Sequence, residues 1–168
     1  MFKELRQRLV GPIFTIFTPY DHNYNIDYQA IESYVTYLYV GGARVFYVMA
    51  YNSRFSQLSD KEINDLNIFC SKLVKGLSKE NIIIVADPIH CSTDLSLQFA
   101  LSAKQAGADA ISLLFREKYF TDQQVLDHYE YIGNKSDFPI IVHEMPFLSG
   151  MNGKQVNWPF SLLEAISK

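Results

Sequence analysis

The feature that most constrains the fold of this chain is an alternation between two hydrophobic patterns. Short apolar runs rich in β-branched residues alternate with longer stretches in which apolar residues recur every three or four positions. The first pattern is typical of buried strands and the second of amphipathic helices. Five such units follow one another along the 168 residues. The sequence therefore predicts an α/β fold built from five βα units.

Local signals place the elements of these units. The expected strands are residues 11–18, 43–50, 82–87, 110–115 and 139–145. The expected helix caps are Asp27, Ser59 with Glu62 in a capping box, Ser92 or Thr93, Thr121 and, for the last helix, Asn157. Glycines 41, 42 and 107 are expected to end helices. The expected buried face of the first of these helices is Ile31, Tyr34, Val35 and Leu38, and that of the second is Ile63, Leu66, Cys70, Leu73 and Leu77.

The arrangement of the strands follows from their composition. They are almost continuously apolar, and each connection is long enough for a crossover helix, so the sheet should be parallel and covered by helices. No GxGxxG or GxxxxGK[ST] follows any strand, which favours a barrel over an open doubly wound sheet. No linker divides the chain. A TIM (β/α)8 barrel needs eight units and typically ~250 residues, so we expect residues 1–168 to be the N-terminal part of one (β/α) barrel domain, with only the first five units present.

Composition and charge exclude several classes of function. A net charge of -3 offers no basic stripe, so nucleic acid is not an expected partner. No apolar run approaches the ~20 residues that a membrane-spanning helix needs, and the N-terminus has no signal-peptide pattern. The two cysteines, Cys70 and Cys91, form no disulfide framework. We therefore expect a cytoplasmic protein without a membrane partner.

The order of several short segments resembles a known family. The segments are GPIFTIFTP at 11–19, NID at 25–27, GG at 41–42, LSDKE at 58–62, AGADA at 106–110, HY at 128–129, FPII at 138–141 and MP at 145–146. In this order and spacing they resemble the dihydrodipicolinate synthase and N-acetylneuraminate lyase group of Schiff-base aldolases. The resemblance covers essentially the whole chain.

The resemblance implies lyase or aldolase chemistry on pyruvate or a related 2-oxo acid. A lysine would form a Schiff base with the ketone, and the adduct would act as an electron sink for cleavage or condensation of a carbon–carbon bond. In the family that lysine lies on the sixth strand, whereas this sequence ends at Lys168, at the close of the fifth expected helix. We do not assign the role to Lys168. We also expect a homo-oligomer, and neither a cofactor nor a metal.

The segment after the second strand departs from the family pattern. The family has Gly-Thr-Thr-Gly-Glu, whose small residues hold the substrate carboxylate, where this chain has Ala50-Tyr51-Asn52-Ser53-Arg54. Asn52 and Ser53 can still donate hydrogen bonds to a carboxylate, and Tyr51 replaces a threonine. These three are the expected substrate-binding residues here. Arg54 either adds a bidentate contact or is a solvated loop residue.

Two further strand ends carry candidate residues. After the fourth strand the family has Pro-Tyr-Tyr, and this chain has Phe115-Arg116-Glu117 with Tyr119 two residues later. Tyr119 either substitutes for the lost phenol in substrate binding or packs at the base of its loop. After the fifth strand the family's proton-shuttling tyrosine is replaced by His143, the expected catalytic residue, because histidine performs acid–base work near neutral pH. The competing interpretation of His143 is a structural histidine.

Two other classes of function stay open. A metal-dependent aldolase would draw its ligands from strand ends, where Asp87, His90, Cys91, His143 and Glu144 fall, although no HxH or HExxH spacing joins them. A non-catalytic or regulatory remnant of the barrel is the second alternative, since the family's lysine, both threonines and the tyrosine are missing from these residues. A half-barrel would also leave two sheet edges unpaired, which predicts dimerisation, a missing C-terminal portion or poor solubility.

Overall fold

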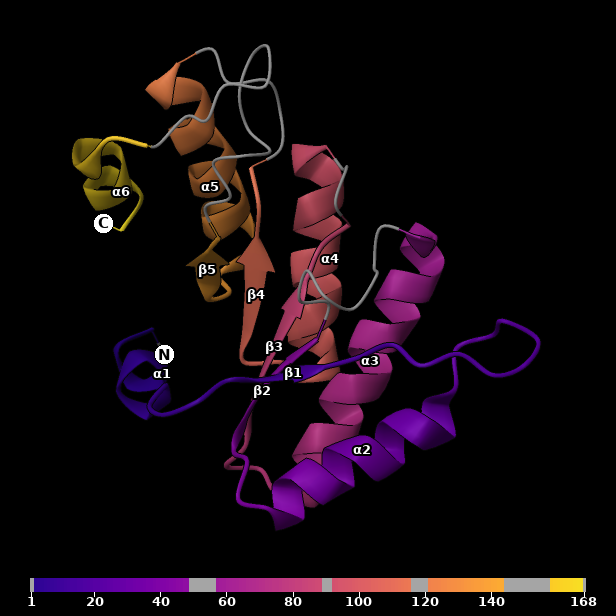
Figure 1. The fold of residues 1–168 in the computed structure, drawn as a ribbon. Coiled ribbons are helices and arrows are strands. Elements are labelled where there is room, and N and C mark those ends of the chain that lie inside the picture. The colour runs from indigo at the N-terminus through magenta and orange to yellow at the C-terminus, as the bar shows by residue number, and fades with distance from the viewer. Residues whose placement is uncertain (1, 49–56, 89–91, 116–120, 144–157, 168) are drawn as a thin grey trace.

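The computed structural model describes residues 2–48, 57–88, 92–115, 121–143 and 158–167. Its centre is one five-stranded sheet in which every neighbouring pair is parallel and the order is β1-β2-β3-β4-β5 (Figure 1). The strands are β1 (Phe14–Ile16), β2 (Val45–Val48), β3 (Ile82–Ala86), β4 (Ala110–Leu113) and β5 (Ile140–Val142). The expected α/β class, the parallel sheet and the five βα units are confirmed.

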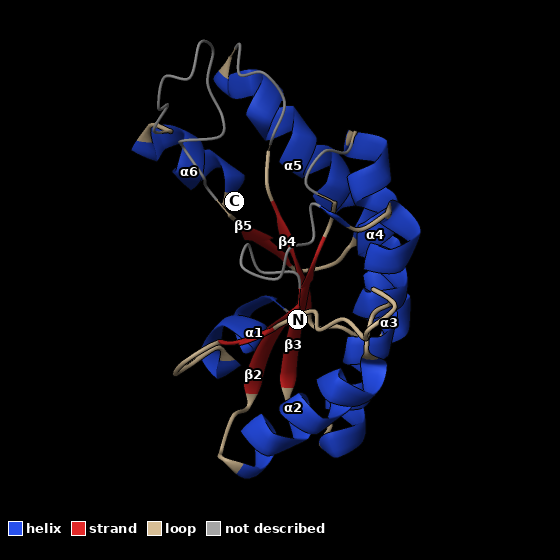
Figure 2. Cartoon of the chain, turned by 45° about the vertical axis from the view of Figure 1, so that its right-hand side comes forward, coloured by secondary structure: helices blue, strands red, loops and turns tan. Residues whose placement is uncertain are grey.

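Helices cover the two faces of this sheet unequally. The helices are α1 (Phe2–Arg8), α2 (Tyr28–Val40), α3 (Asp60–Leu77), α4 (Thr93–Ala106), α5 (Asp122–Ser136) and α6 (Phe160–Ile166). Figure 2 shows α3, α4 and α5 side by side along one face, whereas α1 lies on the opposite, concave side. We call the helix-covered side of the sheet the outer face and the side that carries α1 the inner face. Within the described segments, no helix combines the length and hydropathy needed to cross a bilayer.

The helices begin where the local signals predict. The side chains of Asp27, Ser59, Ser92 and Thr121 accept hydrogen bonds from the backbone amides of Ala30, Glu62, Leu95 and Gln124. Ser59 and Glu62 form the reciprocal capping box. Gly107 ends α4 with φ 87°, a left-handed conformation that glycine adopts without steric cost. The last expected cap, Asn157, lies outside the described residues, and α6 begins behind Pro159 without a side-chain cap.

Two hydrophobic clusters pack against the sheet, one on each face. The larger cluster fills the space between the outer face and the helices, and Phe46, Ile83 and Ile111 are fully buried there. On the inner face a smaller cluster joins Val45, Ile82, Ile84 and Ala110, against which Leu5 and Leu9 pack. The expected buried faces of α2 and α3 are confirmed at Ile31, Val35, Ile63, Leu66 and Cys70, whereas Tyr34, Leu38, Leu73 and Leu77 are only partly buried.

The structure corrects the sequence-based expectations at two kinds of position. Strands β1, β3 and β4 are shorter than expected, because the ladder pairing that defines them stops before the flanking apolar residues do. The last positions of the expected strands 43–50 and 139–145, residues 49–50 and 144–145, lie outside the described residues. Helix α1 was not expected at all, since its seven residues, FKELRQR, carry four charges and only two apolar side chains. Leu5 on this helix and Leu9 just beyond it contact the inner face of the sheet. Helix α1 is therefore stabilised by contacts with distant strands, which cannot be predicted from the sequence of the helix itself.

Candidate functional site

The carboxyl ends of the five strands converge at one edge of the sheet. In a parallel sheet, residues that follow each strand meet at the same edge, which is where α/β proteins bind ligands. Thr18 follows β1, Asp87 follows β3, Phe115 follows β4 and His143 follows β5. We call this the carboxyl edge of the sheet. In Figure 1 the β4 arrow points toward this edge, at the top of the view.

His143 lies on the inner face at the carboxyl edge. Its backbone amide donates to the carbonyl of Leu113 at 3.0 Å, which continues the pairing of β5 with β4 by one residue. Strand side chains alternate between faces, and Ile141, two residues earlier, contacts the inner-face cluster. His143 is half-buried. An imidazole at this place is directed toward the concave side of the sheet, where a substrate could reach it.

Two further polar side chains share the inner face. Tyr47 has the same parity in β2 as Val45, and Ser112 has the same parity in β4 as Ala110; both of these neighbours belong to the inner-face cluster. Ser112 is 3% exposed. Sequence analysis missed both residues because it treated the strands as uniformly apolar. Both could have been predicted from the alternation of strand side chains between the two faces, since each polar residue lies two positions after an apolar residue of the inner face.

The other expected site residues lie outside the described parts of the chain. Tyr51, Asn52, Ser53 and Arg54 follow β2, and Tyr119 follows β4. The structure describes the ends of the elements that flank these segments: Val48 at the end of β2 is buried, and Thr121 caps α5. Both flanking strands end at the carboxyl edge. The structure thus brings the flanking positions to one edge but does not describe the substrate-binding side chains themselves.

The described candidates for a metal site lie on different faces. Asp87 is buried and accepts a 2.6 Å hydrogen bond from the hydroxyl of Ser96 on α4, which places it on the outer, helix-covered side. His143 lies on the inner face. His90, Cys91 and Glu144 lie outside the described residues. Over the ranges that the structure describes, no group of three or more His, Cys, Asp or Glu side chains could hold a metal ion.

A buried histidine lies between α4 and α5 near this edge. His128 of α5 is 6% exposed, and its Nδ1 lies 2.9 Å from the hydroxyl of Thr93, the first residue of α4. Its ring packs edge-on against Phe115, at a centroid distance of 5.4 Å, and against Tyr129. Burial lowers the pKa of His128 from 6.5 to about 4. His128 is therefore neutral at pH 7 and joins the middle of α5 to the first residue of α4.

A comparison with protein families gives a match over most of the chain. The model of the dihydrodipicolinate synthetase family matches residues 8–156. Among curated proteins, the 4-hydroxy-tetrahydrodipicolinate synthase of Staphylococcus epidermidis is 27% identical over 135 residues, which are 80% of this chain and 44% of the relative. The N-acetylneuraminate lyase of Salmonella paratyphi B is 28% identical over 157 residues, 88% of this chain and 49% of that protein. The chain spans about half the length of these relatives.

Solved structures show the same fold. The dihydrodipicolinate synthase of Bacteroides thetaiotaomicron superimposes with a TM-score of 0.80 at 20% identity, over 95% of this chain and 51% of that one. A prophage protein of the dihydrodipicolinic acid synthase family from Escherichia coli, solved in complex with pyruvate, gives a TM-score of 0.76 at 17% identity, over 84% and 46%. These neighbours are TIM barrels, and the five βα units superimpose on about half of each chain.

Proposed function

Because this chain belongs to the dihydrodipicolinate synthetase family, we propose that it supplies the first five βα units of a Schiff-base lyase or aldolase that acts on pyruvate or a related 2-oxo acid. The observation that carries the proposal is the family match over residues 8–156. The similar curated proteins include a synthase and a lyase, which supports chemistry that makes or breaks a carbon–carbon bond. One structural neighbour was solved in complex with pyruvate, which supports a 2-oxo acid as the substrate.

The proposed chemistry begins with a Schiff base between a lysine and the substrate, which this chain's own residues would bind. A lysine amine attacks the ketone carbon of the 2-oxo acid and water leaves, so that the resulting iminium can accept the electron pair of the bond that breaks. We assign this lysine to a sixth strand, beyond the 168 residues of the sequence. Asn52 and Ser53 would hold the substrate carboxylate by hydrogen bonds, with Tyr51 and Tyr119 lining the same mouth. The chain's own residues then bind and orient the substrate.

His143 is the proposed proton carrier. Its inner-face position at the carboxyl edge directs the imidazole toward the place where barrel enzymes bind substrate. Histidine gains and loses a proton close to neutral pH, so it can give a proton to a leaving oxygen and take one back. The proposed enzyme needs no cofactor and no metal, since the iminium supplies the electron sink. We further propose a cytoplasmic homo-oligomer.

Borohydride trapping tests the Schiff base. We expect the longer gene product, incubated with pyruvate and borohydride, to gain one reduced pyruvyl group on a lysine within roughly 40 residues after position 168, since each βα unit of a barrel takes about 30 residues. The 168-residue chain treated in the same way is the matched control and should gain none. The readout is intact mass followed by peptide mapping. A longer product that stays unmodified would remove the pyruvate version of the proposal.

Replacing His143 tests the proton carrier. We expect His143→Phe in the longer product to lower kcat by about 100-fold or more, the range typical of general acid–base catalysis, while the borohydride adduct still forms. The control is His22→Phe, since His22 lies exposed in the loop before α2 and its loss should leave kcat unchanged. Equal turnover in both variants would return His143 to a structural role.

A non-catalytic barrel remnant is the second candidate. It is favoured by one specific observation: Tyr51 and Arg54 stand where the family has small and acidic residues, and His143 stands where it has tyrosine. For this candidate, pyruvate neither forms an adduct nor stabilises the longer product against thermal unfolding. The trapping experiment therefore separates the two candidates, since only the enzyme yields a modified lysine.

A further inference from the structure

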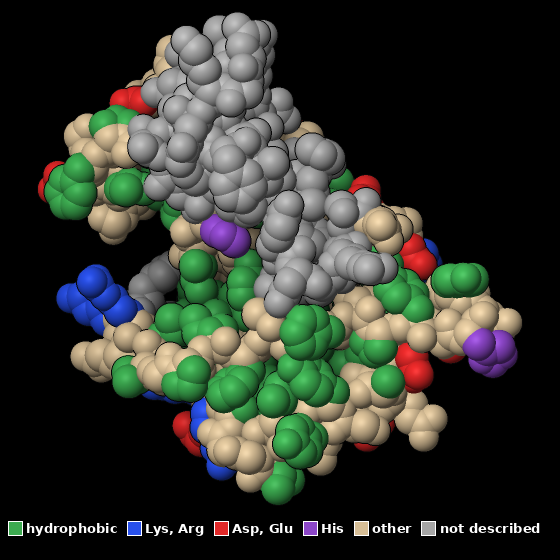
Figure 3. Space-filling model, in the orientation of Figure 1, with side chains coloured by type: hydrophobic (Ala, Val, Ile, Leu, Met, Phe, Trp, Pro, Cys, Tyr) green, Lys and Arg blue, Asp and Glu red, His purple; other side chains and the backbone are tan. Residues whose placement is uncertain are grey.

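A buried tyrosine of α5 lies behind the carboxyl edge. Figure 3 shows hydrophobic side chains on the surface of the face that carries β1 and α2, where Tyr37 is 76% exposed. Tyr129 of α5 is the opposite case, since only 4% of it is exposed. Its ring meets the rings of His128 and Trp158 edge-on, at centroid distances of 5.0 and 6.1 Å. A buried ring with two such neighbours has little freedom to turn, so the hydroxyl group of Tyr129 keeps one direction.

The hydroxyl group of Tyr129 and the backbone of His143 share one acceptor. The hydroxyl donates to the carbonyl oxygen of Leu113, the last residue of β4, at 3.3 Å. The same oxygen accepts a hydrogen bond from the backbone amide of His143 at 3.0 Å. A carbonyl oxygen has two lone pairs, so it can accept both bonds at once. A single atom therefore joins α5 to the residue that we propose as the proton carrier.

The position of His143 depends on this acceptor because β5 is short. Its three residues, 140–142, pair with residues 111–113 of β4 and are all only half-buried. His143 lies one residue beyond this pairing, so its bond to Leu113 is the last rung that the described residues form between the two strands. A small movement of the Leu113 carbonyl would therefore move the backbone that carries the imidazole.

Neither packing nor the pairing of the strands requires a hydroxyl group at this place. A phenylalanine would fill the same space and keep the contacts with His128 and Trp158. The Leu113 carbonyl would be satisfied by the amide of His143 alone. Burying a phenol costs free energy unless its hydroxyl is hydrogen-bonded, so an apolar ring would be the simpler choice for the core. The bond from Tyr129 to Leu113 is explained if it holds the direction of this carbonyl.

We propose that Tyr129 is a positioning residue for His143: its hydroxyl group holds the Leu113 carbonyl, and through that carbonyl the backbone amide of His143, so that the imidazole keeps its place at the carboxyl edge. The inference rests on the proposed role of His143 as proton carrier. Tyr129 packs in the cluster on the outer face, whereas the imidazole lies on the inner face, so Tyr129 acts through the backbone and not on the substrate.

Replacing Tyr129 by phenylalanine in the longer gene product tests the inference, because the change removes one oxygen atom and keeps the ring. We expect Tyr129→Phe to lower kcat about 10-fold, since a displacement of ~1 Å in a reacting group can cost about 100-fold. The KM for the oxo acid and the yield of the borohydride adduct should stay unchanged, because carboxylate binding and Schiff-base formation are assigned to other residues. Tyr131→Phe is the matched control on the same helix: its hydroxyl donates to Asp94 in a solvent-exposed contact of 2.8 Å, and its loss should leave kcat unchanged.

A double variant separates positioning of His143 from a general effect on the fold. Residues that act as a unit have non-additive effects on kcat. If Tyr129 acts through His143, the double variant of Tyr129→Phe with His143→Phe should therefore have the kcat of His143→Phe alone. If Tyr129→Phe only loosened the fold, it would lower kcat by the same factor with and without the histidine. Circular dichroism checks that all variants stay folded.

Three results would overturn the inference while leaving the proposed function in place: a Tyr129→Phe protein with the kcat of the parent, an equal fall of kcat in both backgrounds, or a lower yield of the borohydride adduct. In each case the parent still forms the pyruvate adduct and His143→Phe still lowers kcat. A parent that forms no adduct, or a His143→Phe protein with unchanged turnover, would instead contradict the proposed function, and the role of Tyr129 would fall with it.

Discussion

Acidification is expected to weaken the fold through one side chain, His128, by about 3 kcal/mol. The loss should develop as the pH falls from 6.5, the ordinary pKa of histidine, to about 4, the pKa of His128 in the folded chain. Above pH 6.5 both the folded and the unfolded chain hold this imidazole neutral, so the side chain contributes no pH dependence there. Between the two values the unfolded chain binds a proton that the folded chain does not. Below the folded pKa the loss levels off.

The physical cause is burial among groups that cannot stabilise a cation. His128 is 6% exposed, its ring contacts those of Phe115 and Tyr129, and its Nδ1 lies within hydrogen-bond distance of the hydroxyl of Thr93. Among the described residues, the other ring nitrogen, Nε2, is buried without a hydrogen-bond partner. A proton on this ring would place a charge in an apolar environment, where desolvation is the dominant cost.

The measurement is urea unfolding at a series of pH values, followed by the fluorescence of Trp158, the single tryptophan of the chain. Trp158 reports on this region because its ring packs against Tyr129. His128→Phe should flatten the pH dependence between 6.5 and 4 relative to the parent, even where it changes the stability at neutral pH. His22→Phe, at an exposed loop position, should keep the parent's slope. A His128→Phe protein with the parent's slope would show that other groups cause the acid sensitivity.

Much of this fold was predictable because its determinants are local. Asp27, Ser59 and Thr121 cap helices through hydrogen bonds that reach only three residues along the chain, so the local sequence is enough to predict these helix starts. The strands are likewise predicted by short apolar runs. Helix α1 was missed because its stability comes from contacts with strands that lie far along the sequence.

The candidate site was predictable only as a set of positions. The βα pattern placed His143 at a strand end, and the structure adds that it shares the inner face with Tyr47 and Ser112. Which face a residue occupies depends on strand register, and register is set by pairing between distant segments rather than by local composition. Asp87 shows the same limit: it also follows a strand, yet its hydrogen bond to Ser96 holds it on the outer side.

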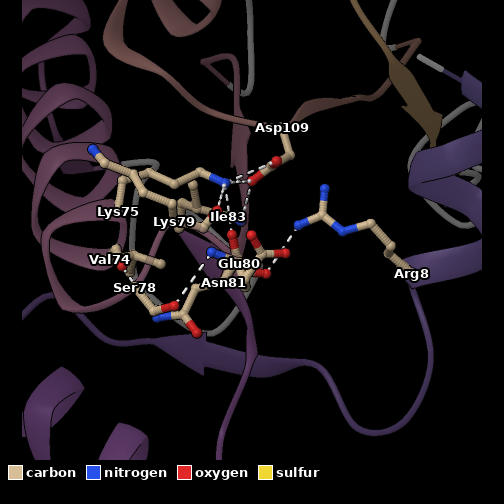
Figure 4. Close-up of polar contacts among 9 residues, drawn as sticks. All are labelled: Arg8, Val74, Lys75, Ser78, Lys79, Glu80, Asn81, Ile83 and Asp109. Carbon is tan, nitrogen blue, oxygen red and sulfur yellow. Dashed lines mark hydrogen bonds and ion pairs between the residues drawn. The ribbon is translucent and has the colours of Figure 1, made fainter.

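Long-range polar contacts are a second class that the sequence could not reveal. Lys75 at the end of α3 and Asp109 before β4 are 34 residues apart, yet they form an ion pair of 2.7 Å at the opposite end of the sheet from the carboxyl edge (Figure 4). The ammonium also donates to the carbonyl of Asn81 at 2.6 Å, and the carboxylate accepts from the amide of Ile83 at 2.9 Å. These contacts tie α3, β3 and β4 together.

Removing the lysine from this pair is expected to cost about 3 kcal/mol of unfolding free energy, the lower end of the range for breaking a buried pair. Both side chains are only 15–16% exposed, so Lys75→Met would leave the Asp109 carboxylate and the Asn81 carbonyl without their cation in a site that water reaches poorly. Lys61→Met is the control on the same helix, because the Lys61–Asp65 pair is largely solvent-exposed and its loss should cost less than about 1 kcal/mol. Urea unfolding at pH 7 measures both.

The double variant Lys75→Met with Asp109→Asn separates the penalty of an unpaired charge from the value of the pair. An asparagine oxygen can still accept from the amide of Ile83, and no buried charge remains. We therefore expect the double variant to be more stable than Lys75→Met alone, since a neutral replacement of a buried pair often costs little. The opposite result would be a double variant that loses as much unfolding free energy as Lys75→Met, or more. It would mean that the attraction within the ion pair stabilises this end of the sheet, and that the cost of Lys75→Met does not come from leaving the Asp109 carboxylate unpaired.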